Sequence, residues 1–459
     1  MLEKPARQLI PEPVIATCHA LVEAGGRAWL VGGCVRDMLL GHMPCDWDIE
    51  VYQLDENKLA RILQHLGRVE YVGQQFGVYK LWSHDVEMDI ALPRKEVKTG
   101  KGHTAFDIVC DAELTPEQAV LRRDFTINAM MFDPLTDKLL DFYGGQNHLQ
   151  TKQLKHVSPA FAEDPLRPLR AMQFAARFGL TLDAQTLDMC KQLLNEAALL
   201  PSARIWQEWL KWSKAEHPSL GLQALKDMGW DMFYPELLAL QGCVQDKYWH
   251  PEGDVWTHTL LVVDEARKLC DIRGLNERES MVLMFAALCH DLGKPLTTRK
   301  DNQGKISSPN HGAAGVKPCE FFLQRIGAPR WLISHVKPLV AEHVAHFSGK
   351  PTLRAIKRLA RRLEPSHIRM WEMLTEADAN GRAPAPPSRP ALAWLELAQE
   401  VGISEEKQAP IVTGKLLLSW GLKPSPMVGD ILKKAYEAQM DGLFTDEVSA
   451  RQWYEKTTG

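Results

Sequence analysis

The sequence lacks three features that would place the protein outside the cytosol. It has nine cysteines, an odd number, and no two of them form a CxxC pair or a disulfide framework. No uninterrupted apolar run approaches the roughly 18 residues that predict a membrane-spanning helix. The opening MLEKPARQLIPEPV carries charges and prolines where a secretory signal peptide has an apolar core. These absences predict a cytoplasmic protein with free thiols and no membrane partner.

The sequence also lacks a large excess of one charge. Lys and Arg number 54 and Asp and Glu 58, which gives a net charge of −4 at pH 7. This excludes a uniformly basic nucleic-acid coat, although a local basic groove stays possible because binding depends on where the charge lies. The content of 45% hydrophobic and 24% charged residues is ordinary for a globular protein. A chain of 459 residues therefore predicts roughly two to four folded domains.

Hydrophobic patterning divides the chain into an α/β part and a helical part. Residues 1–27 predict a leading helix that ends at Gly25-Gly26, and residues 35–40 predict a second helix. From about residue 150 onward helical periodicity dominates, and the Pro-rich segment 382–390 predicts a linker. Short strands are predicted at 28–31, 47–52, 77–82 and 86–92.

Acidic residues alternate along two of the predicted strands. Asp46 and Asp48 face one side of a strand because side chains two residues apart point the same way. Asp89 can add a third carboxylate from a neighbouring strand, and Glu87 is a weaker candidate on the same face. Carboxylate oxygens are the ligands that Mg²⁺ prefers. A single DxD is usually a solvated strand face, so this pattern needs a second feature.

That second feature is the pair Gly32-Gly33, about a dozen residues upstream. It joins a strand to a helix start, where backbone N–H groups can approach a phosphate. Arg36 adds a planar cationic donor. Two glycines alone usually mark a turn, but together with the acidic strands they point to nucleotide chemistry.

Four motifs follow one another in the first 180 residues: GGCVRD at 32–37, DWD at 46–48, RRDFTINAM at 122–130 and EDPLRPLRAMQFAARF at 163–178. With them, the sequence resembles class II tRNA nucleotidyltransferases and bacterial poly(A) polymerases of the nucleotidyltransferase superfamily, over nearly its whole length. The resemblance implies attack of an RNA 3′-hydroxyl on the α-phosphate of a nucleoside triphosphate, with release of pyrophosphate. It also implies that Asp46, Asp48 and Asp89 are catalytic and bind Mg²⁺.

The resemblance assigns nucleotide contacts to the same motifs. Asp124 and Asn128 stand four residues apart, as on one helix face, and would recognise the ribose. Asp164, Arg167 and Arg170 would lie along one side of a helix, and an Asp acceptor beside an Arg fork would select C or A as a protein template. The predicted nucleotide-binding residues are Gly32, Gly33, Arg36, Arg123, Asp124, Asn128, Asp164, Arg167, Arg170 and Gln173.

Gln173 departs from the family pattern, because close relatives often carry a nucleotide-binding Arg at this position.

Two further segments bear on which nucleotides the enzyme adds. Residues 93–103 resemble the flexible loop that helps the family switch from C to A addition. Residues 72–76 lack the paired arginines of poly(A) polymerases. We therefore expect CCA addition from CTP and ATP, with an A-adding tRNA enzyme or a poly(A) polymerase as the alternative.

A second set of possible metal ligands lies beyond residue 250. His290 and Asp291 are adjacent, and His258 and Asp378 are available from other helical segments. This pattern resembles the HD phosphohydrolase domain, which some bacterial CCA-adding enzymes carry. Imidazole with carboxylate suits a divalent metal such as Ni²⁺ or Mn²⁺.

In such a domain a bound water would attack a phosphate ester. His311 and His343 would be second-metal ligands or substrate contacts. The implied substrates are 2′,3′-cyclic phosphates, 2′-nucleotides or terminal phosphates on RNA. The alternative is a structural HD fold without a working metal site.

Basic residues are concentrated at 350–369, where seven Lys or Arg accompany one acidic residue. At helical spacing they predict a stripe that contacts tRNA phosphates. A solvated helix face is the alternative. The predicted RNA-binding residues are Arg354, Lys357, Arg358 and Arg361.

The fold class predicted from these inferences is α+β, with a small mixed sheet in the head. We expect a nucleotidyltransferase head at 1–145, a helical neck and body at 146–245, an HD domain at 246–385 and a helical tail at 386–459. The expected partners are tRNA, CTP and ATP, and the chain is expected to be a monomer or homodimer. An HD phosphohydrolase whose head only binds RNA, or a non-enzymatic RNA-binding protein, is the rival interpretation. The three intact head carboxylates argue against both rivals.

Overall fold

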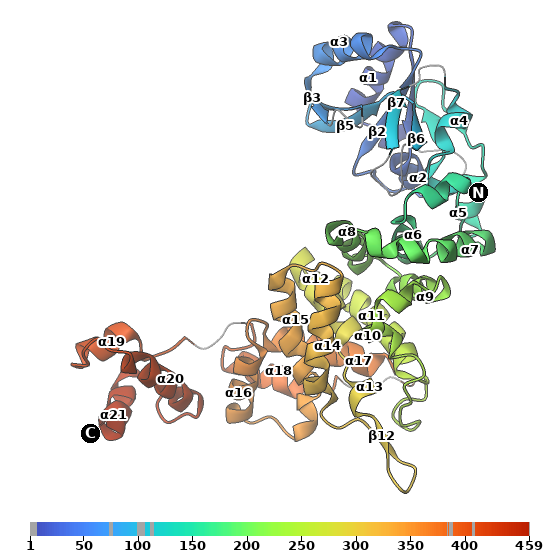
Figure 1. The fold of residues 1–459 in the computed structure, drawn as a ribbon. Helices are drawn as coiled ribbons and strands as arrows, with labels where there is room; N and C mark the ends of the chain where they lie inside the picture. The colour runs from blue at the N-terminus through green and yellow to red at the C-terminus, as the bar shows by residue number, and fades with distance from the viewer. Residues whose placement is uncertain are drawn as a thin grey trace. The chain divides into compact units, whose positions relative to one another are not determined.

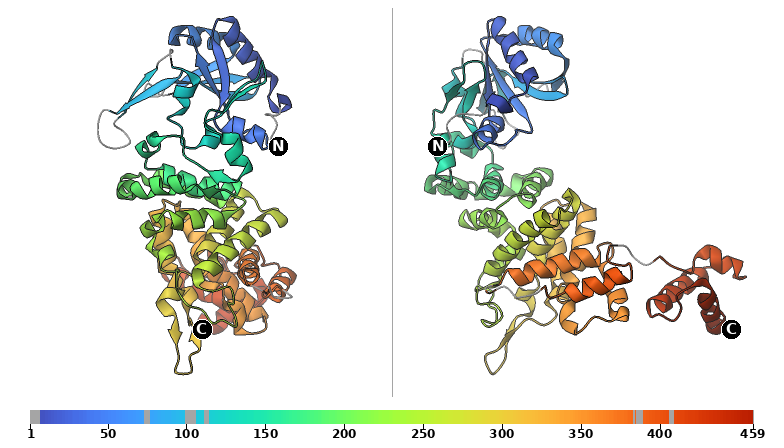
Figure 2. Two further views of the ribbon diagram at one scale, coloured as in Figure 1. Left: turned by 90° about the vertical axis from the view of Figure 1, so that its right-hand side faces the viewer. Right: turned by 180° about the vertical axis from the view of Figure 1, so that it is seen from behind.

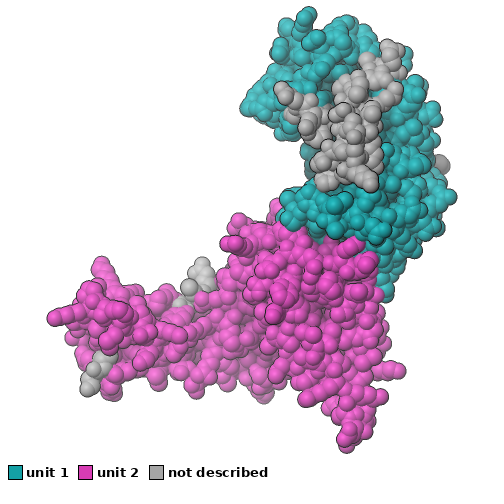
Figure 3. Space-filling model, viewed as in Figure 1, with its two compact units in different colours: residues 1–212, 220–230 teal, residues 213–219, 231–459 magenta. Residues whose placement is uncertain are grey.

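The structure is a computed structural model that divides into two compact units (Figure 3). One unit comprises residues 1–212 with 220–230, and the other comprises residues 213–219 with 231–459. This boundary falls within the predicted neck, and the four-part division stays a prediction. The residues described are 7–72, 77–98, 106–110, 114–382, 384, 389–405 and 409–458, with only the backbone described for 94–98, 106–110 and 458.

A seven-stranded mixed sheet forms the head of the first unit, which confirms the α+β class (Figures 1 and 2). Its order is β3-β4-β5-β2-β1-β8-β9, and β2 and β5 run parallel while the other neighbours run antiparallel. Helices α1 (Glu12–Glu23) and α3 (Glu56–Leu66) pack against the sheet. The strands are β1 (Arg27–Val31), β2 (Trp47–Tyr52), β3 (Arg68–Val72), β4 (Val78–Ser83), β5 (Val86–Ala91), β8 (Met131–Asp133) and β9 (Lys138–Leu140).

The four predicted strands are confirmed to within one residue, but the leading helix is shorter than predicted. Helix α1 begins only after Pro11 and is preceded by a 3-10 turn, η1 (Arg7–Leu9). A proline is tolerated just inside a helix start because the N–H that it lacks has no helical partner. The helix ends before Gly25, which has φ +89°, and Arg27 already belongs to β1. Helix α2 (Gly33–Leu39) follows β1 directly.

Strands β6 (Arg94–Lys98) and β7 (Phe106–Cys110) form a separate antiparallel pair. The predicted flexible loop at 93–103 therefore begins in β6, and its residues 99–103 lie outside the described part of the chain. Residues 73–76, most of the segment that lacks the poly(A) polymerase arginines, also lie outside it.

The rest of the first unit is mainly helical, as predicted from residue 150 onward. Helix α6 buries nine of its twelve residues, and Trp209 and Trp212 of α8 are fully buried. The elements are α4 (Pro116–Val120), η2 (Thr126–Asn128), α5 (Gly145–Gln150), β10 (Gln153–Leu154), η3 (Pro159–Glu163), α6 (Arg167–Phe178), β11 (Thr181–Leu182), α7 (Ala184–Gln192), η4 (Leu194–Leu199), α8 (Ser202–Ser213) and α9 (Pro218–Asp227). The 3-10 turn η5 (Trp230–Phe233) begins at the last residue of this unit and continues in the second.

Helices make up nearly all of the second unit. Helix α12 is buried from Met281 to Cys289 and packs against α11, α15 and α17 (Figures 1 and 2). The elements of its main body are α10 (Pro235–Leu238), α11 (Val255–Ile272), α12 (Glu277–Cys289), α13 (Lys294–Thr297), β12 (Arg299–Lys300), β13 (Ile306–Ser307), α14 (His311–Arg325), α15 (Arg330–Glu342), η6 (Ala345–Ser348), α16 (Leu353–Leu363), α17 (Ile368–Asn380) and α18 (Leu392–Glu400).

The tail has a small apolar core of its own. It comprises α19 (Gly414–Ser419), α20 (Met427–Met440) and α21 (Glu447–Thr458) around Leu417, Ala435 and Phe444. Within the described residues, no helix is both long and apolar enough to cross a membrane. The eight cysteines whose side chains are described are all free.

Candidate active sites

Two carboxylates lie side by side in the head sheet. Asp48 of β2 and Asp89 of β5 lie opposite each other in the parallel strand pair. The two strands are therefore neighbours, as the sequence predicted. The pKa of Asp48 is raised to about 6, chiefly by burial; Arg123 opposes the rise, and Asp89, Asp46 and Glu50 add to it. A carboxylate held among other carboxylates in this way is stabilised by a divalent cation.

Asp46 lies in a bend before β2 and is exposed, so the prediction that it shares the strand with Asp48 is wrong. The ladder with β5 begins only at Trp47, and Asp46 therefore has no strand partner there. Lys80 Nζ lies 3.1 Å from Asp89 Oδ1 and also forms an ion pair with Glu87, so the choice of Asp89 over Glu87 stays a prediction.

A cavity of about 470 Å³ in the first unit brings the four sequence motifs together. Asp46, Asp89 and Gln173 are not among the residues that line it, and Gln173 is buried within α6. The predicted residues that do line it are Gly32, Gly33, Arg36, Asp48, Arg123, Asp124, Asn128, Asp164, Arg167 and Arg170, joined by Arg122, Leu166, Phe174 and Arg204.

A chain of hydrogen bonds links the glycine motif to α6. Arg36 Nη1 donates to Asn128 Oδ1 (2.6 Å), and Asn128 Nδ2 donates to Asp124 Oδ1 (3.0 Å). Arg170 Nε donates to Asp124 Oδ2 (2.7 Å). Although burial raises the pKa of Asp124, Arg170 and Asn128 hold it below its ordinary value. Asp124 and Asn128 meet through the 3-10 turn η2 after an extended Phe125, so the predicted α-helical face is wrong.

Asp164 does not lie on the helix that carries Arg167 and Arg170, contrary to the prediction. It is extended, and its carboxylate accepts from the backbone N–H of Leu166 just before α6 (3.0 Å). Its other oxygen accepts from Arg204 Nη2 of α8 (2.9 Å). Arg167 is buried and donates to backbone carbonyls of Ala160 (2.7 Å) and Arg122 (2.6 Å).

Glu50 is a functional candidate that the sequence interpretation missed. It is 2% exposed and follows Asp48 by two residues on β2. Its Oε2 lies 3.5 Å from Arg122 Nη2 and 3.4 Å from Arg123 Nη2, so it fixes both guanidinium groups. Gly32, with φ +74°, allows Arg123 to approach, because a Cβ there would lie 2.8 Å from Arg123 Nη1.

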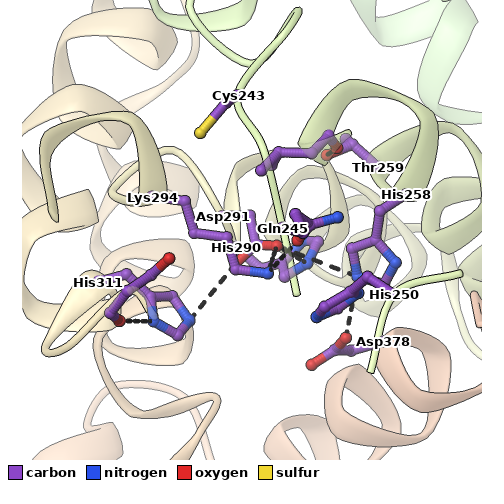
Figure 4. Close-up of polar contacts among 12 residues, drawn as sticks. Cys243, Gln245, His250, His258, Thr259, His290, Asp291, Lys294, His311 and Asp378 are labelled. Carbon is purple, nitrogen blue, oxygen red and sulfur yellow. Dashed lines mark hydrogen bonds and ion pairs between the residues drawn. The ribbon is translucent and has the colours of Figure 1, made fainter. Parts of the chain in front are cut away.

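In the second unit, four histidines surround the carboxylate of Asp291, which is 1% exposed. Figure 4 labels three of them, His258, His290 and His311, together with Asp378. On one side, Oδ2 lies 3.2 Å from His290 Nε2 and 4.0 Å from His258 Nε2. On the other side, Oδ1 lies 3.4 Å from His311 Nε2 and 3.7 Å from His343 Nε2. Five elements far apart in the sequence supply these groups and Asp378, whose Oδ1 lies 3.0 Å from His258 Nε2.

The backbone aims three of these imidazoles. The Nδ1 atoms of His290, His311 and His343 each lie 2.7 Å from a main-chain carbonyl oxygen, which leaves each Nε2 directed at the cluster. His258 Nδ1 lies 2.9 Å from Glu252 Oε1 in the same manner. An outer partner on the second ring nitrogen is the usual arrangement for a histidine that binds a metal.

The charge state of the cluster also suits a cation. Burial raises the pKa of Asp291, but His290 and Lys294 hold it well below its ordinary value. Burial and the neighbouring His311 and His290 lower the pKa of His343 to about 3, so this imidazole is neutral at pH 7. His290 Nε2 and both oxygens of Asp291 are buried without a hydrogen bond, although Lys294 Nζ forms an ion pair with Oδ2 (2.7 Å). These atoms fit a divalent metal, the class of cofactor that an HD domain implies.

A cavity of about 390 Å³ opens onto this cluster. Four polar side chains at or near this cavity received no role from the sequence, because none of them belongs to a His-Asp pair. They are Gln245, Glu252, Lys294 and Arg382. Lys294 Nζ also donates to Gln245 Oε1 (2.6 Å), and Arg382 Nη2 lies 3.6 Å from Asp378 Oδ1. Glu252 holds His258, as described above. Within the described residues, groups of three or more metal-ligand side chains that converge within 4.8 Å occur only around this cavity.

Comparison with known proteins identifies the family. Residues 28–155 match the model of the poly A polymerase head domain, and residues 255–380 match the model of the HD domain. The multifunctional CCA protein of Pasteurella multocida is 36% identical over 371 residues, which cover 78% of this chain and 84% of that protein. The chain belongs to the multifunctional CCA protein family. A relative of the same name from Xylella fastidiosa is 36% identical over 367 residues, with the same coverage of both chains.

Solved structures of CCA-adding enzymes share the fold. The Bacillus stearothermophilus CCA-adding enzyme in complex with CTP aligns with 98% of this chain and 99% of its own, at a TM-score of 0.64 and 19% identity. The Thermotoga maritima CCA-adding enzyme complexed with tRNA aligns with 98% of this chain and 97% of its own, at a TM-score of 0.60 and 18% identity. Family membership makes the chain a tRNA nucleotidyltransferase, and this confirms the expected enzyme class.

Proposed function

We propose that the chain adds CCA to tRNA 3′ ends from CTP and ATP and carries a second, phosphohydrolase site in its HD domain. The observation that carries the first part is the single head cavity that gathers residues of four motifs around Asp48. Structures of the related enzymes with CTP, with ATP and with tRNA support the choice of substrates.

In the head, Asp46, Asp48 and Asp89 are proposed to hold Mg²⁺. When bound, the cations stabilise the negative charge that develops on the phosphates during transfer. Gly32, Gly33 and Arg123 line the place for the triphosphate. The oxygen-only ligand set is the reason for preferring Mg²⁺ here.

Base selection is assigned to Asp164 and Arg167 at the start of α6. Arg204 orients the Asp164 carboxylate, and two backbone carbonyls hold the Arg167 guanidinium. A fixed acceptor and a fixed donor fork can match the pairing edge of C or A without a nucleic-acid template. The bonded chain from Arg36 to Arg170 links α6 to the glycine motif, so base and phosphate are positioned together.

The test of this function is extension of a tRNA that ends before its CCA. With CTP alone the expected product is two residues longer, and ATP then adds one A. Addition of A only to tRNA that already ends in CC would indicate the A-adding enzyme. Long A tails would indicate a poly(A) polymerase.

For the HD cavity we propose hydrolysis of phosphate esters at damaged RNA ends, such as 2′,3′-cyclic phosphates, 2′-nucleotides or terminal phosphates. His258, His290 and Asp378 would hold one divalent metal and His311 with His343 a second, with Asp291 bridging the two. Mixed nitrogen and oxygen ligands favour Ni²⁺ or Mn²⁺. When bound, such metals generate a nucleophilic hydroxide from water near neutral pH. Lys294 and Arg382 are placed to bind the phosphate anion.

Metal analysis of the full chain tests the two-metal arrangement without an activity assay. Because Asp291 presents one oxygen to each histidine pair, we expect two Mn²⁺ per chain at the HD cluster of a variant whose head carries Asp46→Ala and Asp48→Ala. Adding His311→Ala and His343→Ala should leave one. A single Mn²⁺ before the histidine changes would make His311 and His343 substrate contacts instead.

A further inference from the structure

Two exposed aromatic rings stand at the HD cavity. Trp249 is 60% exposed and Phe347 is 67% exposed, yet both line the same cavity as Asp291 and His311. Large apolar rings are costly to leave in water, so a pair of them beside polar ligands points to a bound molecule with a flat apolar face.

Short backbone segments tie both rings to the metal-site residues. Trp249 directly precedes His250, whose Nδ1 lies 2.9 Å from Glu252 Oε1, the carboxylate that also holds His258. Phe347 lies in η6, four residues after His343, and its ring centroid is 4.0 Å from that of His346. Both rings therefore lie on segments that also carry or position residues of the cluster.

Two kinds of side chain line the cavity. Asp291, Lys294 and Arg382 supply charged groups, of which Asp291 and Lys294 are buried, and a phosphate with its metals would lie beside them. The exposed rings of Trp249 and Phe347 add apolar surface, among other residues that include Asp246 and Ser307. A cavity of about 390 Å³ has the size of an ordinary small-ligand site. A ligand that is anionic at one end and flat and apolar at the other matches this arrangement.

We infer that Trp249 and Phe347 form a stacking platform for the nucleobase next to the phosphoester that the HD site hydrolyses. The inference rests on the proposed phosphohydrolase function and adds the residues that make the site prefer a nucleotide over a simple phosphate ester. Every base has a face that stacks on an aromatic side chain, so the platform favours nucleotides without selecting one base strongly.

The test compares two substrates in the full chain with Mn²⁺. One is adenosine 2′,3′-cyclic phosphate, and the other is methyl riboside 2′,3′-cyclic phosphate, which has the sugar and phosphodiester but no base. Trp249→Ala and Phe347→Ala should each lower kcat/KM for the adenosine compound about 5- to 100-fold, in line with the loss of one stacking contact. Neither change should alter kcat/KM for the compound without a base, and Trp249→Phe should restore most of the loss.

Phe321→Ala is the matched control. Phe321 of α14 is an exposed aromatic residue, 48% exposed, and it is not among the residues that line the cavity. It should leave both substrates unaffected. Equal losses on both substrates, or no loss on either, would overturn the platform.

A binding measurement separates this inference from the function on which it rests. Adenosine 2′-monophosphate is titrated calorimetrically into the Mn²⁺-loaded chain and into the two alanine variants. If the unaltered chain hydrolyses neither substrate, the phosphohydrolase proposal fails. Weaker binding to the alanine variants than to the unaltered chain would still support the platform, and equal binding would overturn it.

Discussion

At the scale of single residues, Asp48 combines a cost to folding with the catalytic role proposed for it. Its folded pKa of about 6 lies above the ordinary value of 3.8, chiefly because of burial. A carboxyl group whose pKa is higher in the folded than in the unfolded protein lowers the free energy of unfolding at any pH where it is ionised in both. This loss of stability is complete above pH 6, shrinks as the pH falls through 6, and is gone below about pH 4.

Asp48→Asn removes this cost. In EDTA at pH 8, we expect the free energy of unfolding of this variant to exceed that of the unaltered chain by about 2 kcal/mol. The difference should fall toward zero between pH 6 and pH 4. Urea denaturation at several pH values measures it, with Asp188→Asn at an exposed position of α7 as the control. A pH-independent difference would contradict the explanation.

Glu252 is a second residue for which the effect of a substitution can be predicted, in this case on the affinity for a metal. Its Oε1 lies 2.9 Å from His258 Nδ1. Burial raises the pKa of Glu252, but the hydrogen bonds with His258 and His250 outweigh burial and lower it to about 2. Loss of an outer partner of a metal-bound histidine typically lowers metal affinity about 10- to 100-fold. Glu252→Gln should therefore weaken Mn²⁺ binding at the HD site by that factor.

Competition with a metal chelator measures the Mn²⁺ affinity. Glu265→Gln changes a carboxylate on α11 that pairs with Lys268 away from the cluster, so it should leave the affinity unchanged. Unchanged affinity in Glu252→Gln would show that the backbone alone orients His258.

Residues in short alternating patterns were predictable, and residues that act through distant contacts were not. Asp48 and Asp89 could be paired from sequence because strand alternation fixes the face on which they lie. Glu50 has the same alternation, but its role depends on arginines more than 70 residues away. Arg204 pairs with Asp164 across 40 residues and belongs to no local motif, so only the packing of α8 near α6 reveals it.

At the scale of elements, the arginines of helix α16 form ion pairs with carboxylates of the tail. Arg354 and Arg358 lie 3.0 and 3.1 Å from Asp441 Oδ1, at the end of α20 in the tail. Arg361 lies 3.3 Å from Glu437, and Lys357 is largely buried. The helix was predicted from its period, whereas these partners, about 80 residues further along the chain, were not. tRNA binding at this stripe stays a prediction, and phosphates would have to replace the tail carboxylates.

Neutralising two of these arginines tests the stripe. If Arg358→Ala with Arg361→Ala removes two phosphate contacts, the slope of log Kd against log salt should fall by about 2. Filter binding of tRNA over a range of KCl concentrations measures the slope. The paired cations Arg267 and Lys268 on α11, both changed to Ala, serve as the matched control. An unchanged slope would leave the stripe as a solvated and ion-paired helix face.

The start of α6 shows the limits of prediction for an element boundary. A pattern of three-residue spacings placed Asp164, Arg167 and Arg170 on one helix, but the helix begins at Arg167, with Pro168 in its first turn. Asp164 instead accepts from the backbone N–H of Leu166 ahead of it. Helix starts depend on such side-chain to backbone bonds, which periodicity does not describe.

At the scale of the whole molecule, the chain contains two separate cavities, each lined by residues proposed to be catalytic. The head cavity belongs to the first unit, and the HD cavity to the second. They differ in chemistry as well as place, since one presents carboxylates and arginines and the other imidazoles around a bridging carboxylate. The net charge of −4 conceals this division. We predict that nucleotide addition at the head cavity and phosphoester hydrolysis at the HD cavity each proceed without the other.

The most direct test measures both activities in three proteins: the unaltered chain, Asp46→Ala with Asp48→Ala, and His290→Ala with Asp291→Ala. The first assay is CCA addition to tRNA that lacks its 3′ end, and the second is hydrolysis of adenosine 2′,3′-cyclic phosphate with Mn²⁺. We predict that the head variant loses addition but keeps hydrolysis, and that the HD variant loses hydrolysis but keeps addition. Loss of both activities together in either folded variant would contradict the account.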